Sequence, residues 1–253
     1  MNIDDRFKNK IAVVTGGATG IGKGIALRLG KEGAILALFD VNQDLLAETV
    51  NELIETGICA KGYMVDISDE AQVLRGVKAV ESDWQKIDIL VNAAGIVGPT
   101  STNITEFPTA EFDKIYGINL KGTFLITKYI LCVMEKVGTG RLLLISSIAG
   151  KEGNPGMVGY SATKAGVIGL VKGVAKEFAG TGISINGLAP AVIKTSMNGH
   201  TSTEQLQYMT AKIPMKRLGT IEEVAAMSCF IVSDENSFST GFIYDVSGGR
   251  ATY

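Results

Sequence analysis

Short apolar segments alternate with longer amphipathic segments along almost the whole chain, and this alternation restricts the fold more than any other feature. The runs predicted as strands are Ile11–Thr15 and residues 34–39, 62–65, 87–91, 141–145, 183–188 and 242–246. The segments predicted as helices are residues 20–32, 42–56, 109–137, 157–179 and 221–232, with a further helix directly after its expected cap, Ser68. Strands that are apolar throughout must be covered on both faces, which is typical of a parallel sheet.

The order of these elements predicts an α/β fold. Parallel strands joined by right-handed helical crossovers give a Rossmann-type, doubly wound, seven-stranded parallel sheet with helices on both faces. With 253 residues, of which 46% are hydrophobic, the chain suits a single domain over residues 1–253 with a substantial core. A closed eight-stranded barrel is the alternative at this length, but seven strands and a glycine-rich turn after the first strand favour the open sheet.

Charge and cysteine content argue against several classes of protein. The formal net charge is −2, and Lys and Arg are dispersed, so neither nucleic acid nor an anionic membrane is expected as a partner. No apolar run is long enough to span a bilayer, and the charged N-terminal segment lacks the apolar core of a signal peptide. Cys59, Cys132 and Cys229 lie far apart, and His200 is the one histidine. We therefore expect reduced thiols, no metal site and a cytoplasmic location.

The sequence TGGATGIG, residues 15–22, lies between the first predicted strand and the first predicted helix. Gly16, Gly20 and Gly22 form the pattern G-x-x-x-G-x-G, in which glycine permits positive φ and a close approach of the backbone to a ligand. The free N–H groups and the positive end of the helix would then face a pyrophosphate. A glycine pattern alone often marks only a tight turn, but the order strand, turn, helix indicates a dinucleotide cofactor.

Asp40 stands at the end of the second predicted strand, beyond the glycine-rich turn. A carboxylate at that position accepts hydrogen bonds from both ribose hydroxyls of NAD and repels the 2′-phosphate of NADP. Neither Thr19 nor Val41 offers a cation for that phosphate. The cofactor is therefore predicted to be NAD, although a surface aspartate at a strand end would also account for the residue.

The segment YSATK contains a tyrosine and a lysine, Tyr160 and Lys164. On a helix these positions share one face, and a nearby ammonium group lowers the pKa of a phenol, which makes the phenol usable for proton transfer. The spacing alone is a weak signal, because Tyr208 and Lys212 repeat it. Only Tyr160 follows a serine at the carboxyl end of a predicted strand, where open parallel sheets bind their ligands.

Five motifs together resemble those of the short-chain dehydrogenase/reductase family over essentially the whole chain. In order, they are TGGATGIG, then Asn92-Ala93-Ala94-Gly95 after the fourth predicted strand, Asn119 in INLKG, Ser147 after the fifth strand, and Tyr160 with Lys164. Each motif is weak alone, whereas the five in this order are specific. The resemblance implies an NAD-dependent oxidoreductase that interconverts a secondary alcohol and a ketone.

The resemblance assigns the catalytic roles to Ser147, Tyr160, Lys164 and Asn119. It implies that Tyr160, as a phenolate, removes the alcohol proton while a hydride passes to the nicotinamide, and that Ser147 donates to the substrate oxygen. Lys164 is expected to lower the pKa of Tyr160 and to hold the nicotinamide ribose, and Asn119 to anchor a water molecule linking Lys164 to solvent. Ser146 is adjacent, but neighbouring side chains of a strand point in opposite directions, and the spacing to Tyr160 favours Ser147.

The same resemblance transfers the cofactor contacts to positions throughout the chain. They are Gly16, Thr19, Gly20, Ile21, Gly22, Asp40, Asp66, Ile67, Asn92, Ala93, Gly95, Tyr160, Lys164, Pro190, Ile193 and Thr195. Ile21 is expected beneath the nicotinamide, and Asp66 and Ile67 at the adenine. Ile193 and Thr195 are expected at the carboxamide, in a segment where Ala191 replaces the glycine that is usual in the family.

The substrate is encoded more weakly than the cofactor. A substrate lid is expected at about residues 189–217, whose polar character favours a small polar substrate, namely a sugar, a polyol or a sugar acid such as a 2-keto-3-deoxy acid. Candidate substrate contacts are Lys151, Asn154, His200 and Arg250, although solvated loop positions would also explain Lys151 and His200. The tail SGGRATY resembles that of family members that oxidise sugars or deoxy-keto sugar acids, so Arg250 is a candidate contact for an acidic substrate across a subunit interface.

The resemblance also implies a homotetramer, in which the helices at residues 109–137 and 157–179 pair across two-fold axes. The main alternative function is a 3-oxoacyl-[acyl-carrier-protein] reductase, which shares all five motifs. That enzyme would use NADPH and place basic residues near the glycine-rich turn. A more remote alternative is a sensor that binds NAD without turnover, which would have no need of Ser147, Tyr160 and Lys164.

Overall fold

The computed structural model describes residues 5–195, 207 and 209–251. Its centre is a seven-stranded parallel sheet with the strand order β3-β2-β1-β4-β5-β6-β7. The strands are β1 Ile11–Thr15, β2 Ile35–Asp40, β3 Ala60–Met64, β4 Ile89–Asn92, β5 Thr139–Ile145, β6 Gly182–Pro190 and β7 Ile243–Val246. The predicted fold class is confirmed, and the strand ends differ from the predicted ones by no more than two residues.

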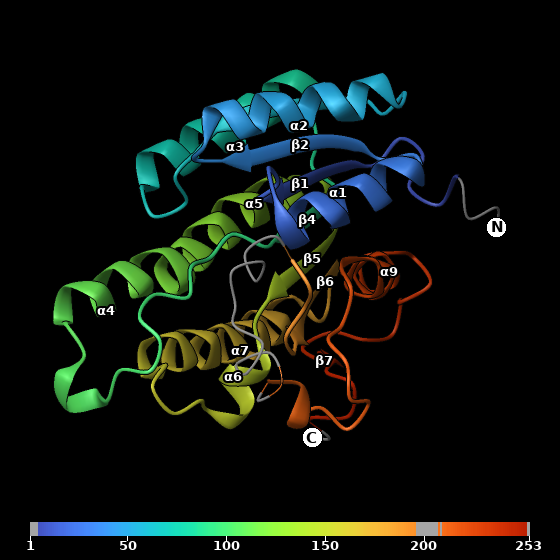
Figure 1. Cartoon of the computed structure of the whole chain (residues 1–253). Helices are drawn as coiled ribbons and strands as arrows, with labels where there is room; N and C mark the ends of the chain where they lie inside the picture. Colours follow the sequence, from blue (N-terminus) through green and yellow to red (C-terminus); the bar gives the residue numbers. More distant parts are fainter. Residues whose placement is uncertain (1–4, 196–206, 208, 252–253) are drawn as a thin grey trace.

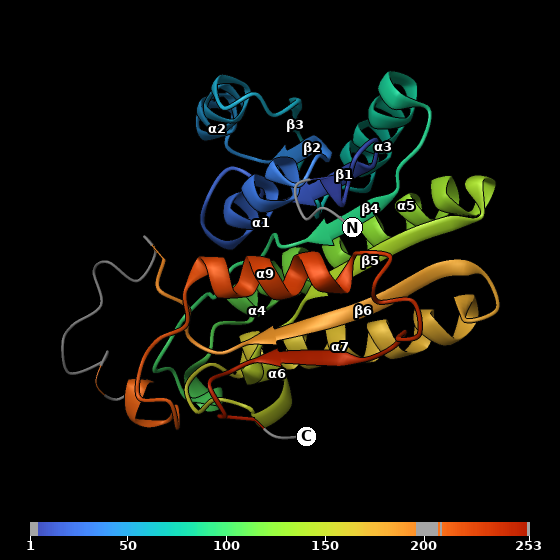
Figure 2. The ribbon, with the colours of Figure 1, turned by 90° about the vertical axis from the view of Figure 1, so that its right-hand side faces the viewer.

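Helices cover both faces of the sheet (Figures 1 and 2). One face packs against α3 Glu70–Trp84, α5 Thr123–Val137 and α7 Val158–Phe178. The other face packs against α1 Gly20–Lys31, α2 Gln43–Glu55 and α9 Ile221–Ile231. The two helical layers explain why the strands carry apolar residues at every position instead of at alternate positions.

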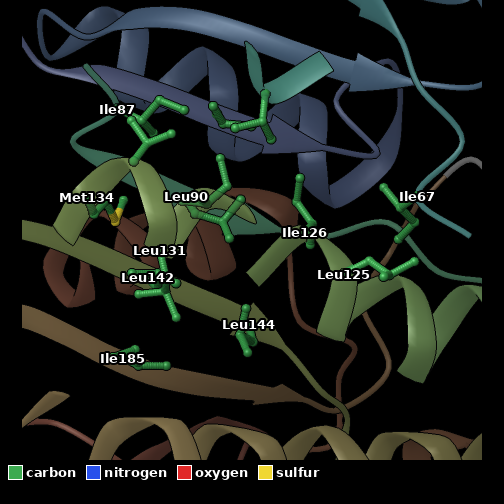
Figure 3. Close-up of a cluster of buried hydrophobic side chains, with 14 of the residues drawn as sticks. Ile67, Ile87, Leu90, Leu125, Ile126, Leu131, Met134, Leu142, Leu144 and Ile185 are labelled. Carbon is green, nitrogen blue, oxygen red and sulfur yellow. The ribbon is translucent and has the colours of Figure 1, made fainter. Parts of the chain in front are cut away.

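Alternate residues of one strand therefore enter two different cores. In β1, Ile11 and Val13 belong to the core beneath α3, α5 and α7, whereas Ala12 and Val14 belong to the core beneath α1, α2 and α9. Figure 3 shows part of the first core, in which Leu144 of β5 packs in one cluster with helix residues such as Ile126. Burying one large aliphatic side chain contributes about 1.5–3 kcal/mol, so both cores stabilise the packing of the helices on the sheet.

The order of the strands reverses at β1, which pairs with β2 on one side and with β4 on the other. In open parallel sheets the crevice outside the carboxyl ends of the strands at such a reversal is the place where ligands bind. Thr15, Asp40, Asn92 and Ile145 are the last residues of β1, β2, β4 and β5. The sheet therefore brings the segments that carry the predicted motifs to a single edge.

Three helical features differ from the prediction. The helix predicted over residues 109–137 is interrupted by a π-helical turn, so that it comprises α4 Thr109–Tyr116, η3 Gly117–Gly122 and α5. Two short helices were not predicted, the 3₁₀ helix η2 Ile104–Glu106 and α6 Ile148–Glu152. The cap of α3 is Asp69, whose carboxylate accepts from the N–H of Gln72, and not Ser68. Thr220 does cap α9, in a reciprocal capping box with Glu223.

Candidate active site

The glycine-rich loop between β1 and α1 depends on glycine at three positions. Gly16 and Gly20 have φ of 63° and 54°, in the left-handed region that other residues rarely adopt. A Cβ atom on Gly22 would lie 2.1 Å from the carbonyl oxygen of Gly16, so a side chain there would force the loop apart. Thr19 occupies the N-cap of α1 without a side-chain cap bond, so its hydroxyl does not compete with a ligand for the first N–H groups of the helix.

The carboxylate of Asp40 lies against this loop. Its Oδ2 accepts from the N–H of Ala18 at 3.1 Å, and its Oδ1 accepts from the N–H of Asn42 at 3.0 Å. These two bonds fix the carboxylate beside the loop, and each oxygen keeps a lone pair for a further donor.

The predicted adenine contacts occupy different environments. The Asp66 carboxylate accepts from both the N–H and the hydroxyl of Ser68, at 2.8 Å and 2.7 Å. Ile67 is buried, and its side chain packs directly against the backbone of Gly122. A Cβ atom on that glycine would lie only 2.8 Å from the Ile67 Cγ1. The Ile67 side chain therefore contacts the protein interior.

Asn92 faces the interior as well. Its Oδ1 accepts from the Thr15 hydroxyl at 2.6 Å, and its Nδ2 donates to the Thr123 hydroxyl at 2.8 Å. With 1% of its surface exposed, Asn92 links β1, β4 and α5 through its side chain. The following loop lies close to β1, because a Cβ on Gly16 would approach the Ala94 Cα to 2.9 Å.

Asn119 lies in the π turn and connects three segments. Its side chain bonds the backbone of Ile96 twice, accepting from the N–H and donating to the carbonyl oxygen, both at 2.8 Å. It also donates to the Thr163 hydroxyl at 3.3 Å, between Tyr160 and Lys164 on α7. Gly95 permits this approach, because a Cβ there would lie 3.1 Å from the Asn119 Oδ1 and 3.5 Å from the Lys164 Nζ.

The two adjacent serines after β5 have separate environments, as expected for neighbouring side chains. Ser146 is buried and donates to the carbonyl oxygen of Lys164 at 2.8 Å. Ser147 caps α6, its Oγ accepting from the N–H of Ala149 at 3.1 Å, and its hydroxyl lies close enough to the Tyr160 hydroxyl to favour a lower pKa of Tyr160. Ser147, and not Ser146, is therefore the serine that meets Tyr160.

Tyr160 and Lys164 lie on α7 as predicted, but their electrostatic relation differs from the expectation. Burial raises the pKa of Tyr160 above its ordinary value, and the nearby Ser147 hydroxyl opposes this shift only in part. Burial also lowers the pKa of Lys164 to about 8. The Lys164 ammonium donates to the carbonyl oxygen of Ile145 at 2.9 Å and lies 5.7 Å from the centre of the Tyr160 ring. In this structure burial therefore dominates the pKa of Tyr160.

The predicted substrate contacts Lys151, Asn154 and Arg250 come together where α6 meets the C-terminal segment. The Lys151 ammonium pairs with the Asp245 carboxylate at 2.9 Å and 3.0 Å. The Arg250 guanidinium donates to Glu152 at 2.9 Å and to the Asn154 side-chain oxygen at 2.8 Å. Both cations are about nine-tenths buried, so Lys151 is not the solvated loop lysine considered from the sequence.

Sequence reasoning missed the partners of these residues. Asp245 and Glu152 lie 94 and 98 residues from their cations. Thr15 and Thr163 lie within TGGATGIG and YSATK, but neither motif predicts a role for them, and Thr123 lies in no motif. A search for polar residues at the carboxyl ends of strands would have found Thr15, but no local pattern identifies the others.

The second half of the predicted site is only partly described. Pro190 ends β6, and Ala191 continues the sheet by donating its N–H to the Val246 carbonyl oxygen at 2.9 Å. Ile193 is buried and forms a bridge with Gly219. Thr195 is the last described residue before the gap; residues 196–206 and 208 of the predicted lid, among them His200 and Tyr208, lie outside the described residues.

Within the described part of the chain, no group of three or more His, Cys, Asp or Glu side chains is placed to hold a metal ion. In the same residues, no helix has the length and apolar character required to traverse a bilayer. The three cysteines are free thiols, and burial raises the pKa of Cys229 to about 12. Thiol chemistry at neutral pH is therefore not a property of Cys229.

Comparisons with known proteins agree with this geometry. Residues 16–251 match the family model described as Enoyl-(Acyl carrier protein) reductase. A 2-dehydro-3-deoxy-L-rhamnonate dehydrogenase (NAD(+)) from Sphingomonas sp. strain SKA58 is 44% identical over 98% of both chains. A 3-oxoacyl-[acyl-carrier-protein] reductase from Thermotoga maritima is 35% identical over 96% of this chain and 98% of its own.

Two solved structures share the fold over nearly the whole chain. The crystal structure of levodione reductase superposes with a TM-score of 0.93 at 34% identity, covering 98% of this chain and 100% of the other. NAD+-bound xylitol dehydrogenase superposes with a TM-score of 0.91 at 30% identity, covering 96% of this chain and 100% of the other. Sequence, fold and relatives lead to one conclusion: the chain belongs to the short-chain dehydrogenase/reductase family.

Proposed function

We propose that the protein is an NAD-dependent oxidoreductase that interconverts a secondary alcohol and a ketone on a small polar substrate. The observation that carries the proposal is the proximity of the Ser147 and Tyr160 hydroxyls, one helical turn from the buried ammonium group of Lys164. A hydroxyl donor, a phenol and a cation are the groups needed to orient an alcohol and to take its proton.

The residues around the glycine-rich loop fit a bound dinucleotide. Gly22 keeps the loop closed against α1, and the N-terminus of that helix suits a pyrophosphate. The Asp40 carboxylate suits the two hydroxyls of an adenosine ribose and disfavours a 2′-phosphate, which supports NAD over NADP. When bound, NAD accepts or returns the hydride at its nicotinamide ring.

In the oxidative direction, the phenolic oxygen of Tyr160 takes the proton of the substrate hydroxyl. Ser147 donates a hydrogen bond to the same substrate oxygen and holds it against Tyr160. Because burial raises the pKa of Tyr160, proton removal needs a nearby positive charge, which Lys164 supplies. Asn119 fixes α7 against the loop after β4, and so holds Tyr160 and Lys164 in place.

The substrate class is the most specific part of the proposal. The relative that is 44% identical acts, by its name, on a deoxy-keto sugar acid. Lys151 and Arg250 provide two cations next to the helix that Ser147 begins, which supports a substrate with a carboxylate. Both cations already pair with carboxylates of this chain, so a substrate acid would share or displace Asp245 or Glu152.

A 3-oxoacyl-[acyl-carrier-protein] reductase remains the second candidate, because a relative with that name is 35% identical. Asp40 opposes it, since a carboxylate beside the glycine-rich loop repels the extra phosphate of NADPH. A sensor that binds NAD without turnover would not need Ser147 next to the Tyr160 hydroxyl.

The test is turnover by the purified protein with a panel of sugars, sugar acids, polyols and a 3-oxoacyl thioester, with NAD(H) and NADP(H) in parallel. We expect NAD reduction with a hydroxylated acid or sugar, and at least a thousandfold lower kcat in Tyr160→Phe. Tyr63→Phe is the matched control, because Tyr63 lies on the edge strand β3, where its hydroxyl bonds Asp83 of α3, and its loss should leave kcat unchanged. Turnover of only the thioester with NADPH would assign the reductase function instead.

We also propose a homotetramer that works in the cytoplasm. The outer face of α4, η3, α5 and α7 carries a groove of about 680 Å³ lined by residues such as Tyr116, Leu120, Phe124 and Gly166. Tyr116 and Phe124 are 45% and 49% exposed, which supports packing against a second copy. Phe124→Arg should reduce the mass measured by light scattering after size exclusion, and an unchanged mass would exclude this face as a subunit interface.

The proposed cytoplasmic location is supported by the exposed free thiols of Cys59 and Cys132, which suit a reducing compartment.

A further inference from the structure

A continuous chain of hydrogen bonds runs beneath the candidate site, from the glycine-rich loop to the π turn. The N–H of Ala94 donates to the Thr15 hydroxyl at 3.1 Å, which donates to Asn92 at 2.6 Å. The Asn92 amide donates to the Thr123 hydroxyl at 2.8 Å, which donates to the carbonyl oxygen of Asn119 at 2.6 Å. Thr15, Asn92 and Thr123 are each no more than 2% exposed.

The chemistry of the groups fixes the direction of every bond in this chain. An amide nitrogen and a backbone N–H can only donate, so the Thr15 and Thr123 hydroxyls must accept from them. Each hydroxyl then has one proton left, which goes to Asn92 Oδ1 and to the Asn119 carbonyl oxygen. Removing the Thr123 hydroxyl would leave a buried donor on Asn92 and a buried acceptor on Asn119 without these partners, and such groups are costly.

Thr123 also occupies the position at which the π turn returns to α5. In an α-helix the carbonyl oxygen of Asn119 would accept from the N–H of Thr123, four residues on. Here the N–H of Thr123 bonds the carbonyl oxygen of Leu120 instead. The Thr123 hydroxyl donates to the Asn119 carbonyl oxygen in place of the Thr123 N–H. The hydroxyl therefore replaces the backbone hydrogen bond that is missing at the π turn.

The π turn in turn determines where the Asn119 side chain lies. That side chain bonds Ile96 twice and also reaches Thr163, whose hydroxyl donates to the Tyr160 carbonyl oxygen at 2.9 Å. Return of the turn to regular α-helix would rotate Asn119 about its helix and break these bonds.

We propose that Thr123 is a positioning residue of the active site: its hydroxyl stabilises the π turn and thereby holds Asn119 against Ile96 and Thr163. The catalytic part of this inference rests on the proposed function. Its structural part concerns the protein without substrate or cofactor and can be measured separately.

The chain offers a matched control on the same helix. Thr127 lies one turn beyond Thr123, is also 2% exposed, and its hydroxyl has no hydrogen-bond partner. Thr123→Val and Thr127→Val are therefore the same substitution at two equally buried positions of α5. Only the first removes a hydroxyl that is bonded on both sides. Thr123→Ser restores that hydroxyl and gives the rescue.

The first measurement is amide hydrogen exchange of the protein without ligands. In Thr123→Val we expect residues 117–122 and Ile96 to exchange at least tenfold faster than in the wild type, with Thr123→Ser and Thr127→Val unchanged. Equal exchange in Thr123→Val and the wild type would overturn the structural part. If Thr123→Val does not fold, Thr123→Ala replaces it in the same comparison with Thr123→Ser.

The second measurement is steady-state kinetics on the best substrate of the panel. We expect Thr123→Val to lower kcat about tenfold with KM for NAD within twofold, and Thr123→Ser and Thr127→Val to stay within threefold of the wild type. Normal kcat in Thr123→Val despite faster exchange would overturn the catalytic part. A wild-type protein with no turnover would refute the proposed function and with it this catalytic part, whereas the exchange result would still decide whether Thr123 holds the turn.

Discussion

Replacing Lys164 by methionine should make the protein more stable near neutral pH while abolishing its activity. Lys164 is 5% exposed and makes a hydrogen bond to the Ile145 carbonyl oxygen, and its pKa is lowered by burial to about 8 from an ordinary 10.5. One pKa unit corresponds to about 1.4 kcal/mol, so keeping this lysine charged in the folded state costs about 3 kcal/mol. Methionine fills a similar volume without a charge.

The sign of the pH dependence follows from proton binding. Between pH 8 and 10.5 the unfolded chain holds the Lys164 proton and the folded protein has lost it, so wild-type stability rises with pH over this interval. The penalty is complete below pH 8 and absent above 10.5. Methionine also leaves the Ile145 carbonyl oxygen without its donor, which costs about 1 kcal/mol at any pH. Lys164→Met should therefore be about 2 kcal/mol more stable at pH 7 and about 1 kcal/mol less stable above pH 10.5.

The assay is urea unfolding followed by circular dichroism at pH 7 and pH 10.5, at one fixed protein concentration because assembly would add to the measured stability. Lys172→Met is the control, since Lys172 lies on the same helix with its side chain exposed, and it should change the free energy of unfolding by less than about 0.5 kcal/mol at both pH values. A Lys164→Met variant no more stable than the wild type at pH 7, or a stability difference independent of pH, would refute the reasoning.

Three further substitutions test other parts of the site. Asp40→Ala removes the carboxylate beside the glycine-rich loop. It should lower kcat/KM for NAD by about tenfold to a hundredfold, whereas kcat/KM for NADP should not fall. An unchanged ratio of these two values would count against the proposed contact of Asp40 with the adenosine ribose. Gly22→Ala places a Cβ 2.1 Å from the Gly16 carbonyl oxygen and should lower both Tm and NAD affinity in calorimetry, whereas Gly173→Ala, where a Cβ meets open space on α7, should not lower Tm. Arg250→Ala should raise KM for an acidic substrate and leave NAD affinity unchanged in a binding titration; equal KM values would remove Arg250 from the substrate site.

The fold was predictable because its signals are local. The central strands β1, β2 and β4 are short, almost entirely apolar runs. The eight residues of TGGATGIG predict the turn, the start of the helix and a close approach of the backbone at Gly22. The predicted cap of α3 failed because Ser68 and Asp69 are both good capping residues, and Ser68 is instead bonded to Asp66. The short helix α6 was missed because its five residues are followed by a glycine- and proline-containing loop, and its cap, Ser147, had been assigned to the substrate.

The structure brings the residues of the candidate site together, but the sequence does not predict their hydrogen bonds. The family resemblance points to Asn119, Ser147, Tyr160 and Lys164, yet nothing in it states that Lys164 donates to the Ile145 carbonyl oxygen instead of the Tyr160 hydroxyl. The π turn illustrates the same limit, because a regular amphipathic pattern continues through it. What distinguishes the turn is a tertiary arrangement: Asn119 bonded to Ile96 by its side chain and to Thr123 by its carbonyl oxygen. Local sequence therefore specifies which polar side chains lie at the sheet edge. Long-range packing decides which hydrogen bonds these side chains form with the rest of the protein.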